Sequence, residues 1–183
     1  MTTVISLVAL TDLKEAVASF ALVPDEWWRL GGVTMITSFF VHGSPMHLIG
    51  NMYFLMIFGD NVEDFVGRGR FLLLLLLSTL AGDLFHILAH PDSTMPCVGA
   101  SGGISGVFVF YALQFPQARL GFLFRAFYRV FRWISMPAAM ALVLWVAYQF
   151  VLAGMQMTGL SNVSAMAHLG GAMTGLFFWL WEG

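Results

Sequence analysis

The chain has 183 residues, of which 59% are hydrophobic and only 10% are charged, and its mean hydropathy is +0.83. This composition excludes a soluble globular domain and indicates an integral, multi-pass protein of the lipid bilayer. The formal net charge of −2 is uninformative about nucleic acid, but no Lys/Arg cluster resembles a groove-binding patch, so no nucleic-acid partner is expected. A single cysteine, Cys97, excludes an internal disulfide and a cysteine-based metal site.

The N-terminal segment is apolar over residues 1–10 but is then interrupted by Asp12, Lys14 and Glu15. Ten helical residues rise only ~15 Å, about half the thickness of the hydrocarbon core. We therefore expect a short or truncated first span, unless residues 17–23 extend it imperfectly. The segment has no recognisable cleavable leader.

Five further segments are apolar enough to be membrane spans, and they cover residues 45–58, 71–90, 101–115, 134–153 and 163–181. Together with the first segment they predict an all-α membrane protein, a bundle of six transmembrane helices. No linker, repeat or low-complexity boundary divides the sequence, so residues 1–183 are expected to form a single domain.

Arginines define the expected orientation of the spans. They concentrate in the two loops before residues 71 and 134, and they are Arg68, Arg70, Arg119, Arg125, Arg129 and Arg132. Because two spans separate these loops, both lie on one side, which the positive-inside rule makes cytoplasmic. The spans that begin at residues 45, 101 and 163 therefore start at the outer face. The polar residues near their starts, namely His47, Asn51, Ser101 and His168, are expected at one depth.

Ser101 lies in a run of small residues, 98–106, at the expected start of a membrane helix. The N–H groups of a first helical turn have no intrahelical acceptor, and they suit a developing oxyanion. A hydroxyl at this position is therefore a candidate nucleophile. The alternative is that Gly102 and Gly106 form a small-residue face for helix packing, with Ser101 as one more small residue or a helix cap.

His168 lies one turn into the last span, where an ionisable residue is costly and usually faces a cavity or a partner. Gly171 and Gly175, four residues apart, give this helix a flat face for close packing. We expect that face to meet Gly102 and Gly106, which would bring His168 toward Ser101 as its base. Taken alone, His168 is equally consistent with a histidine that only packs between helices.

His47 and Asn51 share one face of the span that Ser44 and Pro45 begin as N-cap and first helical residue. A neutral imidazole and a carboxamide both donate hydrogen bonds to an oxyanion without adding a buried charge. The alternative is a pair of interhelical hydrogen bonds. His42 precedes this span, and it is equally consistent with a residue that only anchors the loop.

These residues together resemble the rhomboid family of intramembrane proteases. The family's motifs occur in its order on alternate spans: H-x-x-x-N at residues 47–51 with a histidine five residues earlier at His42, G-x-S-G at 99–102, and A-H-x-x-G-x-x-x-G at 167–175. Trp28-Arg29 resembles the tryptophan-arginine element of the family's first outer loop. The likeness covers roughly residues 22–182, and each motif is short, so its weight comes from the order of all three.

The resemblance implies a serine endopeptidase that cleaves transmembrane segments with a serine–histidine dyad and no cofactor. By analogy, Ser101 is the nucleophile and His168 is the general base, while His47, Asn51 and the Ser101 N–H form the oxyanion hole. The supporting residues are His42, Gly99, Gly102 and Gly171. Family members often carry an aromatic residue one turn after the nucleophile, packed on the base, and this chain has Ser105 there.

Hydrolysis requires water, so we expect Ser101 in a cavity open to the outer face and lined by His42, His47, Asn51 and His86. No acid is expected to complete a triad. Asp83 is expected to pair locally with His86, three residues later.

Three other classes remain as alternatives. A catalytically silent relative would bind membrane proteins through the same fold, although that class is expected to lack the serine or the histidine. A metal site is favoured by five histidines in the outer half of the bundle, but H-E-x-x-H is absent and no metal is expected. A transporter would show internal repeats. The expected location is a bacterial inner membrane.

Overall fold

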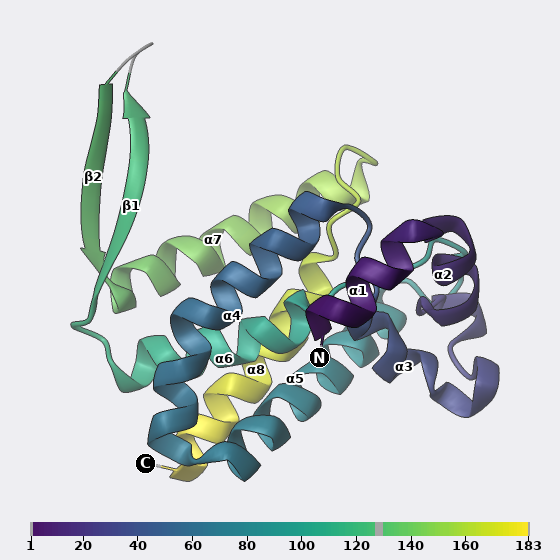
Figure 1. The fold of residues 1–183 in the computed structure, drawn as a ribbon, viewed down its shortest axis with the longest axis horizontal. Coiled ribbons are helices and arrows are strands. Elements are labelled where there is room, and N and C mark those ends of the chain that lie inside the picture. Colours follow the sequence, from purple (N-terminus) through teal and green to yellow (C-terminus); the bar gives the residue numbers. More distant parts are fainter. Residues whose placement is uncertain (1, 127–129, 183) are drawn as a thin grey trace.

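The computed structural model describes residues 2–126 and 130–182, most of them helical (Figure 1). The longer elements in chain order are α1 (Thr2–Thr11), α2 (Leu13–Phe20), α4 (Pro45–Val66), α5 (Arg68–Ala89), α6 (Ser101–Gln114), β1 (Arg119–Ala126), β2 (Val130–Pro137), α7 (Ala138–Met157) and α8 (Ala165–Glu182). Between α2 and α4 the chain forms four short helical turns: η1 (Pro24–Glu26), η2 (Arg29–Gly32), α3 (Thr34–Thr37) and η3 (Ser38–Phe40). Each of the five main predicted spans corresponds to one helix.

The N-terminal segment forms two helices rather than one. Asp12 ends the first and caps the second, because its carboxylate accepts a hydrogen bond from the Glu15 N–H at 3.2 Å. Residues 17–23 therefore do not extend the first helix, and that alternative was wrong. The Arg29 guanidinium donates to the carbonyls of Ala18 and Ala21, both at 2.8 Å, so it closes the C-terminal end of α2.

Helix α6 forms the centre of the helical body. Every residue from Gly102 to Ala112 is buried, and the helix packs against α4, α5 and α8. Toward the middle of the body the Phe58 ring of α4 lies 4.9 Å from the Phe108 ring and 5.0 Å from the Tyr111 ring, centroid to centroid. This burial explains why α6 consists almost entirely of small and apolar side chains.

Helices α6 and α8 pack through their glycines, as the sequence predicts. A Cβ on Gly171 would overlap the carbonyl oxygen of Gly102, and a Cβ on Gly175 would overlap that of Gly106. The two backbones approach so closely because neither helix places a side chain at the contact. The predicted meeting of these two faces is confirmed.

A two-stranded antiparallel hairpin, β1–β2, joins α6 to α7 and extends away from the helices (Figure 1). The sequence predicts a loop here and a span that begins at residue 134, and this prediction was wrong: residues 134–137 belong to β2, and α7 starts at Ala138. Strand β2 includes Trp133 and Ile134, aromatic and β-branched residues of the kind that favour strands. Arg129, one of the predicted cytoplasmic arginines, lies outside the described residues.

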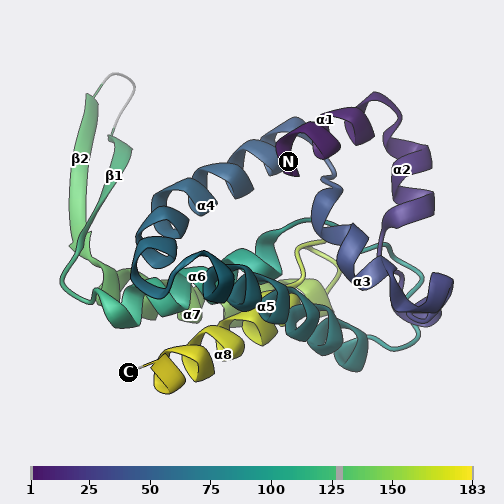
Figure 2. The same cartoon turned by 60° about the horizontal axis from the view of Figure 1, so that its bottom comes forward.

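The starts of α4, α6 and α8 lie at one end of the body, the right-hand end in Figure 1. At the other end, the Arg70 guanidinium forms an ion pair with Glu182 at 2.8 Å, which ties the start of α5 to the end of α8. Figure 2 shows α2 and α3 beside the first end. Within the described residues, two helices, α5 and α7, are long and apolar enough to cross a membrane by length and composition.

Candidate active site

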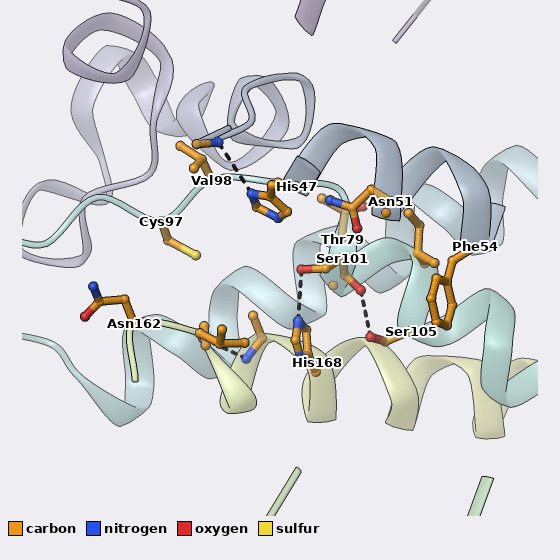
Figure 3. A pocket seen from close by; sticks show the side chains of 18 of the residues that line it. His47, Asn51, Phe54, Thr79, Cys97, Val98, Ser101, Ser105, Asn162 and His168 are labelled. Carbon is orange, nitrogen blue, oxygen red and sulfur yellow. Dashed lines mark hydrogen bonds between the residues drawn. The ribbon is translucent and has the colours of Figure 1, made fainter. Parts of the chain in front are cut away.

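A cavity of about 740 Å³ opens between the starts of α4, α6 and α8 (Figure 3). The side chains that line it come from α4 to α8 and from the loops between them, and they include His47 and Asn51 of α4, Asp83 of α5, Ser101 of α6, His168 of α8 and Cys97 of the α5–α6 loop. The fold thus brings all three predicted polar clusters to one space, although they lie far apart in the sequence.

Ser101 and His168 are in direct contact across this cavity. The Ser101 Oγ lies 2.9 Å from the His168 Nε2, within hydrogen-bond distance (Figure 3). The approach depends on Gly82 of α5, because a Cβ at that position would lie only 2.6 Å from the carbonyl oxygen of Ala167. A serine hydroxyl bonded to an imidazole is the pairing that activates a serine nucleophile.

The other nitrogen of the His168 ring is bonded to a residue that the sequence analysis missed. The Gln149 Oε1 of α7 lies 2.8 Å from the His168 Nδ1, and the Trp145 ring, one turn earlier, lies 6.4 Å from the imidazole between centroids. A carboxamide in the middle of an apolar helix is costly unless it has a partner, and this signal could have identified Gln149 from the sequence.

His47 and Asn51 lie on one face of α4, toward the loop that leads to Ser101. The Gly43 N–H donates to the His47 Nδ1 at 3.4 Å, so the proton of a neutral His47 ring resides on Nε2. The Nε2 edge of the His47 ring faces Gly99.

Gly99 leaves the room that this arrangement needs. A Cβ at position 99 would lie 2.7 Å from the His47 Nε2 and 3.5 Å from the Asn51 Nδ2. Gly99 also has a φ of +118°, which disfavours other residues. The Asn51 Nδ2 is buried and has no partner among the described residues. Two donors are therefore available beside Ser101.

His42 does not line the cavity, and neither does His86, so the expected lining was wrong for both. His42 is fully buried behind His47, with its ring 5.1 Å away, and its Nδ1 lies 3.0 Å from the Ser6 Oγ. Ser6 also donates to the Phe40 carbonyl at 2.7 Å, so His42 anchors the loop before α4 to α1. Burial, followed by the neighbouring His47, lowers the pKa of His42 to about 4.

The expected pairing of Asp83 with His86 was also wrong. The His86 Nδ1 lies 2.7 Å from the Oγ of Ser164, which caps α8 through the Ala167 N–H, while Asp83 accepts from the Ser38 hydroxyl at 3.4 Å. Each of the two side chains instead has a polar partner on a different element.

Ser105 occupies the position where an aromatic residue was expected from the resemblance. Its hydroxyl donates back to the Ser101 carbonyl at 2.7 Å, so it does not cover the imidazole. Trp145 of α7 lies beside the His168 ring instead, and it packs edge-on against Phe108 with centroids 5.5 Å apart.

Cys97 places a thiol in the lining of the same cavity. Burial, followed by the Asp83 carboxyl, raises the pKa of the thiol to about 12. Across the described parts of the chain, no group of three or more His, Cys, Asp or Glu side chains is arranged to hold a metal ion.

The chain is similar to several rhomboid-like proteins. It is 32% identical over 148 residues to presenilin-associated rhomboid-like protein A, mitochondrial, of Danio rerio, a match that covers 79% of this chain and 36% of that protein. It is 32% identical over 150 residues to rhomboid protein 1, mitochondrial, of Saccharomyces cerevisiae, covering 80% and 40%. It is 35% identical over 86 residues to the putative rhomboid protease YdcA of Bacillus subtilis, covering 47% and 40%.

The chain spans less than half the length of these relatives. The mitochondrial names of the first two conflict with the bacterial inner membrane expected from the sequence. The profile of the rhomboid domain matches residues 24–181, which include all three motifs and the whole cavity. The chain is therefore an integral membrane protein that belongs to the rhomboid family.

Proposed function

We propose that the chain is an intramembrane serine endopeptidase that cleaves transmembrane segments of membrane proteins. The observation that carries the proposal is the 2.9 Å contact between the Ser101 Oγ and the His168 Nε2 inside a cavity of about 740 Å³. Membership of the rhomboid family and the similarity to a putative rhomboid protease support it. In this reaction Ser101 attacks the scissile carbonyl carbon, and His168 takes the hydroxyl proton and gives it to the leaving amine.

The negative charge of the tetrahedral intermediate falls on the former carbonyl oxygen. We assign its stabilisation to three donors: the His47 Nε2–H, the Asn51 amide and the main-chain N–H of Ser101. All three are neutral, and the third belongs to the first turn of α6, where N–H groups have no intrahelical acceptor. Gly99 supports this arrangement by leaving room for His47, as Gly82, Gly102 and Gly171 do for the approach of α8.

The substrate is proposed to be a membrane helix whose end unwinds into the cavity. The amide groups of a helix are already hydrogen-bonded, so its peptide bonds are poorly exposed to attack. We propose that α1 and α4 to α8 form the six-helix transmembrane bundle around this reaction, with α1 as the short first span. The cavity then opens toward the face from which α4, α6 and α8 begin, where water is available.

The second candidate is a catalytically silent rhomboid-like protein that binds membrane proteins. Several relatives carry the name "rhomboid-like", which does not distinguish a protease from a protein that only binds. The bonded Ser101–His168 pair favours the protease, because a protein that only binds has no need of it.

The test is labelling of the detergent-solubilised protein with a fluorophosphonate probe, which reacts with activated serines. The wild type is expected to be labelled, while Ser101→Ala and His168→Ala are not. Ser135→Ala is the matched control, since Ser135 lies exposed on β2, away from the cavity, and its loss should leave labelling unchanged. A folded wild type that is not labelled would favour the silent binding protein, and labelling that survives Ser101→Ala would mean that Ser101 is not the nucleophile.

A further inference from the structure

Gln149 is almost completely enclosed, with 1% of its surface exposed, and it lies on a helix whose other side chains are mostly apolar. Its carboxamide has two neighbours. The Nε2 lies 3.4 Å from the Trp145 carbonyl oxygen, one turn earlier on α7, and the Oε1 lies 2.8 Å from the His168 Nδ1 on α8. The side chain thus joins α7 to the candidate base.

These neighbours determine which way the amide faces. A main-chain carbonyl oxygen can only accept a hydrogen bond, so the group that faces the Trp145 carbonyl must be the NH₂. The amide oxygen then faces the imidazole, and a carbonyl oxygen likewise can only accept. The proton between Gln149 and His168 therefore resides on the His168 Nδ1.

The position of that proton fixes the chemistry of the opposite nitrogen. A neutral imidazole with its proton on Nδ1 has a free lone pair on Nε2, and this is the nitrogen that lies 2.9 Å from the Ser101 Oγ. The other tautomer would direct an N–H at the serine and could not accept its proton. Gln149 selects the competent form without bringing a charge into the body of the protein.

We propose that Gln149 is a positioning residue for the reaction, one that holds His168 in the tautomer and ring orientation that receives the Ser101 proton. This proposal rests on the proposed function. During attack the Ser101 O–H bond breaks, its proton moves to the His168 Nε2, and Oγ bonds to the substrate carbon. The resulting imidazolium keeps its Nδ1–H bond to Gln149, and its Nε2 proton later goes to the leaving amine. No proton passes to the amide.

The first test compares two substitutions of similar size. Gln149→Met removes the acceptor, so kcat is expected to fall about 10- to 100-fold with little change in KM, because the ring loses its fixed orientation. Gln149→Glu retains an acceptor at the same reach and should recover most of the lost rate. Tyr148→Phe is the control on α7, since Tyr148 is largely exposed and its hydroxyl should not matter. A Gln149→Met enzyme with full kcat would overturn the proposal.

The second test uses the pH profile, which a purely structural role would not move. In Gln149→Glu a carboxylate beside Nδ1 stabilises the imidazolium, so the acidic limb of kcat/KM is expected to move up by about one to three pH units. The other titratable groups that line the cavity are His47 of α4, Asp83 of α5 and Cys97 of the α5–α6 loop, and they are the same in every variant. An unmoved limb in an active Gln149→Glu enzyme would also overturn the proposal.

The third test needs no activity and separates this proposal from the proposed function. Nitrogen-15 NMR of protein labelled at histidine is expected to show His168 with a protonated Nδ1 and a bare Nε2, with the signals assigned by their loss in His168→Ala. In Gln149→Met this preference should disappear. If the probe fails to label Ser101 in the wild type, the proposed function fails, and the spectra still decide the role of Gln149: a proton on Nε2 in the wild type refutes it.

Discussion

Gly171 of α8 lies directly against the carbonyl oxygen of Gly102 in α6, one residue after the candidate nucleophile. The contact is between two main chains, so neither side can yield as a flexible side chain would. The distance between Ser101 and His168 therefore depends on a position that carries no functional group at all.

Gly171→Ala is expected to destabilise the protein, because its methyl group would overlap the Gly102 carbonyl. The cost should reach at least the upper end of the about 1–3 kcal/mol typical of overpacking. Gly154→Ala on α7 is the matched control: nothing lies within 4 Å of its added Cβ, and it should stabilise by about 0.5–1 kcal/mol through helix propensity. Thermal unfolding in detergent measures both, and equal melting temperatures would contradict the packing argument.

Asn51→Ala is expected to reduce kcat about 10²- to 10³-fold with little change in KM, since its unpartnered Nδ2 is proposed to bond the oxyanion only in the transition state. Asn61→Ala is the control on the same helix, because Asn61 is exposed and donates only to the Ile57 carbonyl. Steady-state cleavage of a model transmembrane substrate gives both constants. A rise in KM alone would assign Asn51 to substrate binding instead.

Acid should destabilise the loop before α4 through His42. The pKa of this buried ring is about 4, below the ordinary 6.5, so the folded state resists protonation while the unfolded state accepts it. Stability is therefore unaffected above about pH 6.5 and falls as the pH drops from 6.5 toward 4, by up to about 3 kcal/mol from this group. Unfolding midpoints between pH 7.5 and 4.5 measure the slope. His42→Asn should make the slope shallower, and an unchanged slope would mean that His42 does not contribute to it.

Cys97 should be slow to alkylate although it lines the cavity. With a thiol pKa of about 12, the reactive thiolate is scarce at pH 8. Labelling by N-ethylmaleimide, followed by mass spectrometry, is expected to be slow at pH 8 and to accelerate about tenfold per pH unit up to pH 10. The denatured protein provides the reference, and fast labelling of the native protein at pH 8 would contradict the raised pKa.

Much of the site could be predicted because it depends on local patterns. Small residues at a spacing of four marked the faces of α6 and α8, and the arginines placed the starts of α4, α6 and α8 at one end. A polar side chain at such a start has few places to point other than the space between the helices. The contact of Ser101 with His168 followed from those two inferences.

The rest depends on partners that are distant in the sequence. Whether His42 faces the cavity or Ser6 is decided by where α1 lies, and the choice of Ser164 as the partner of His86 is decided by the start of α8. The hairpin was missed because arginines among apolar residues satisfy the pattern of a cytoplasmic loop as well as that of strands. Gln149 was missed for a different reason: it is a single amide in an otherwise apolar segment, and its partner, His168, lies on another helix.

The link between α7 and His168 has a thermodynamic consequence. Of the 20 residues of α7 only Ala138, Ala141, Gln149 and Leu152 are buried, so this helix is held by few side chains, and one of them is the partner of the imidazole. Displacing α7 and releasing the ring are then one equilibrium. A molecule that binds more tightly when α7 is docked stabilises the oriented ring, and one that wedges α7 outward frees it, by the same free energy in either direction.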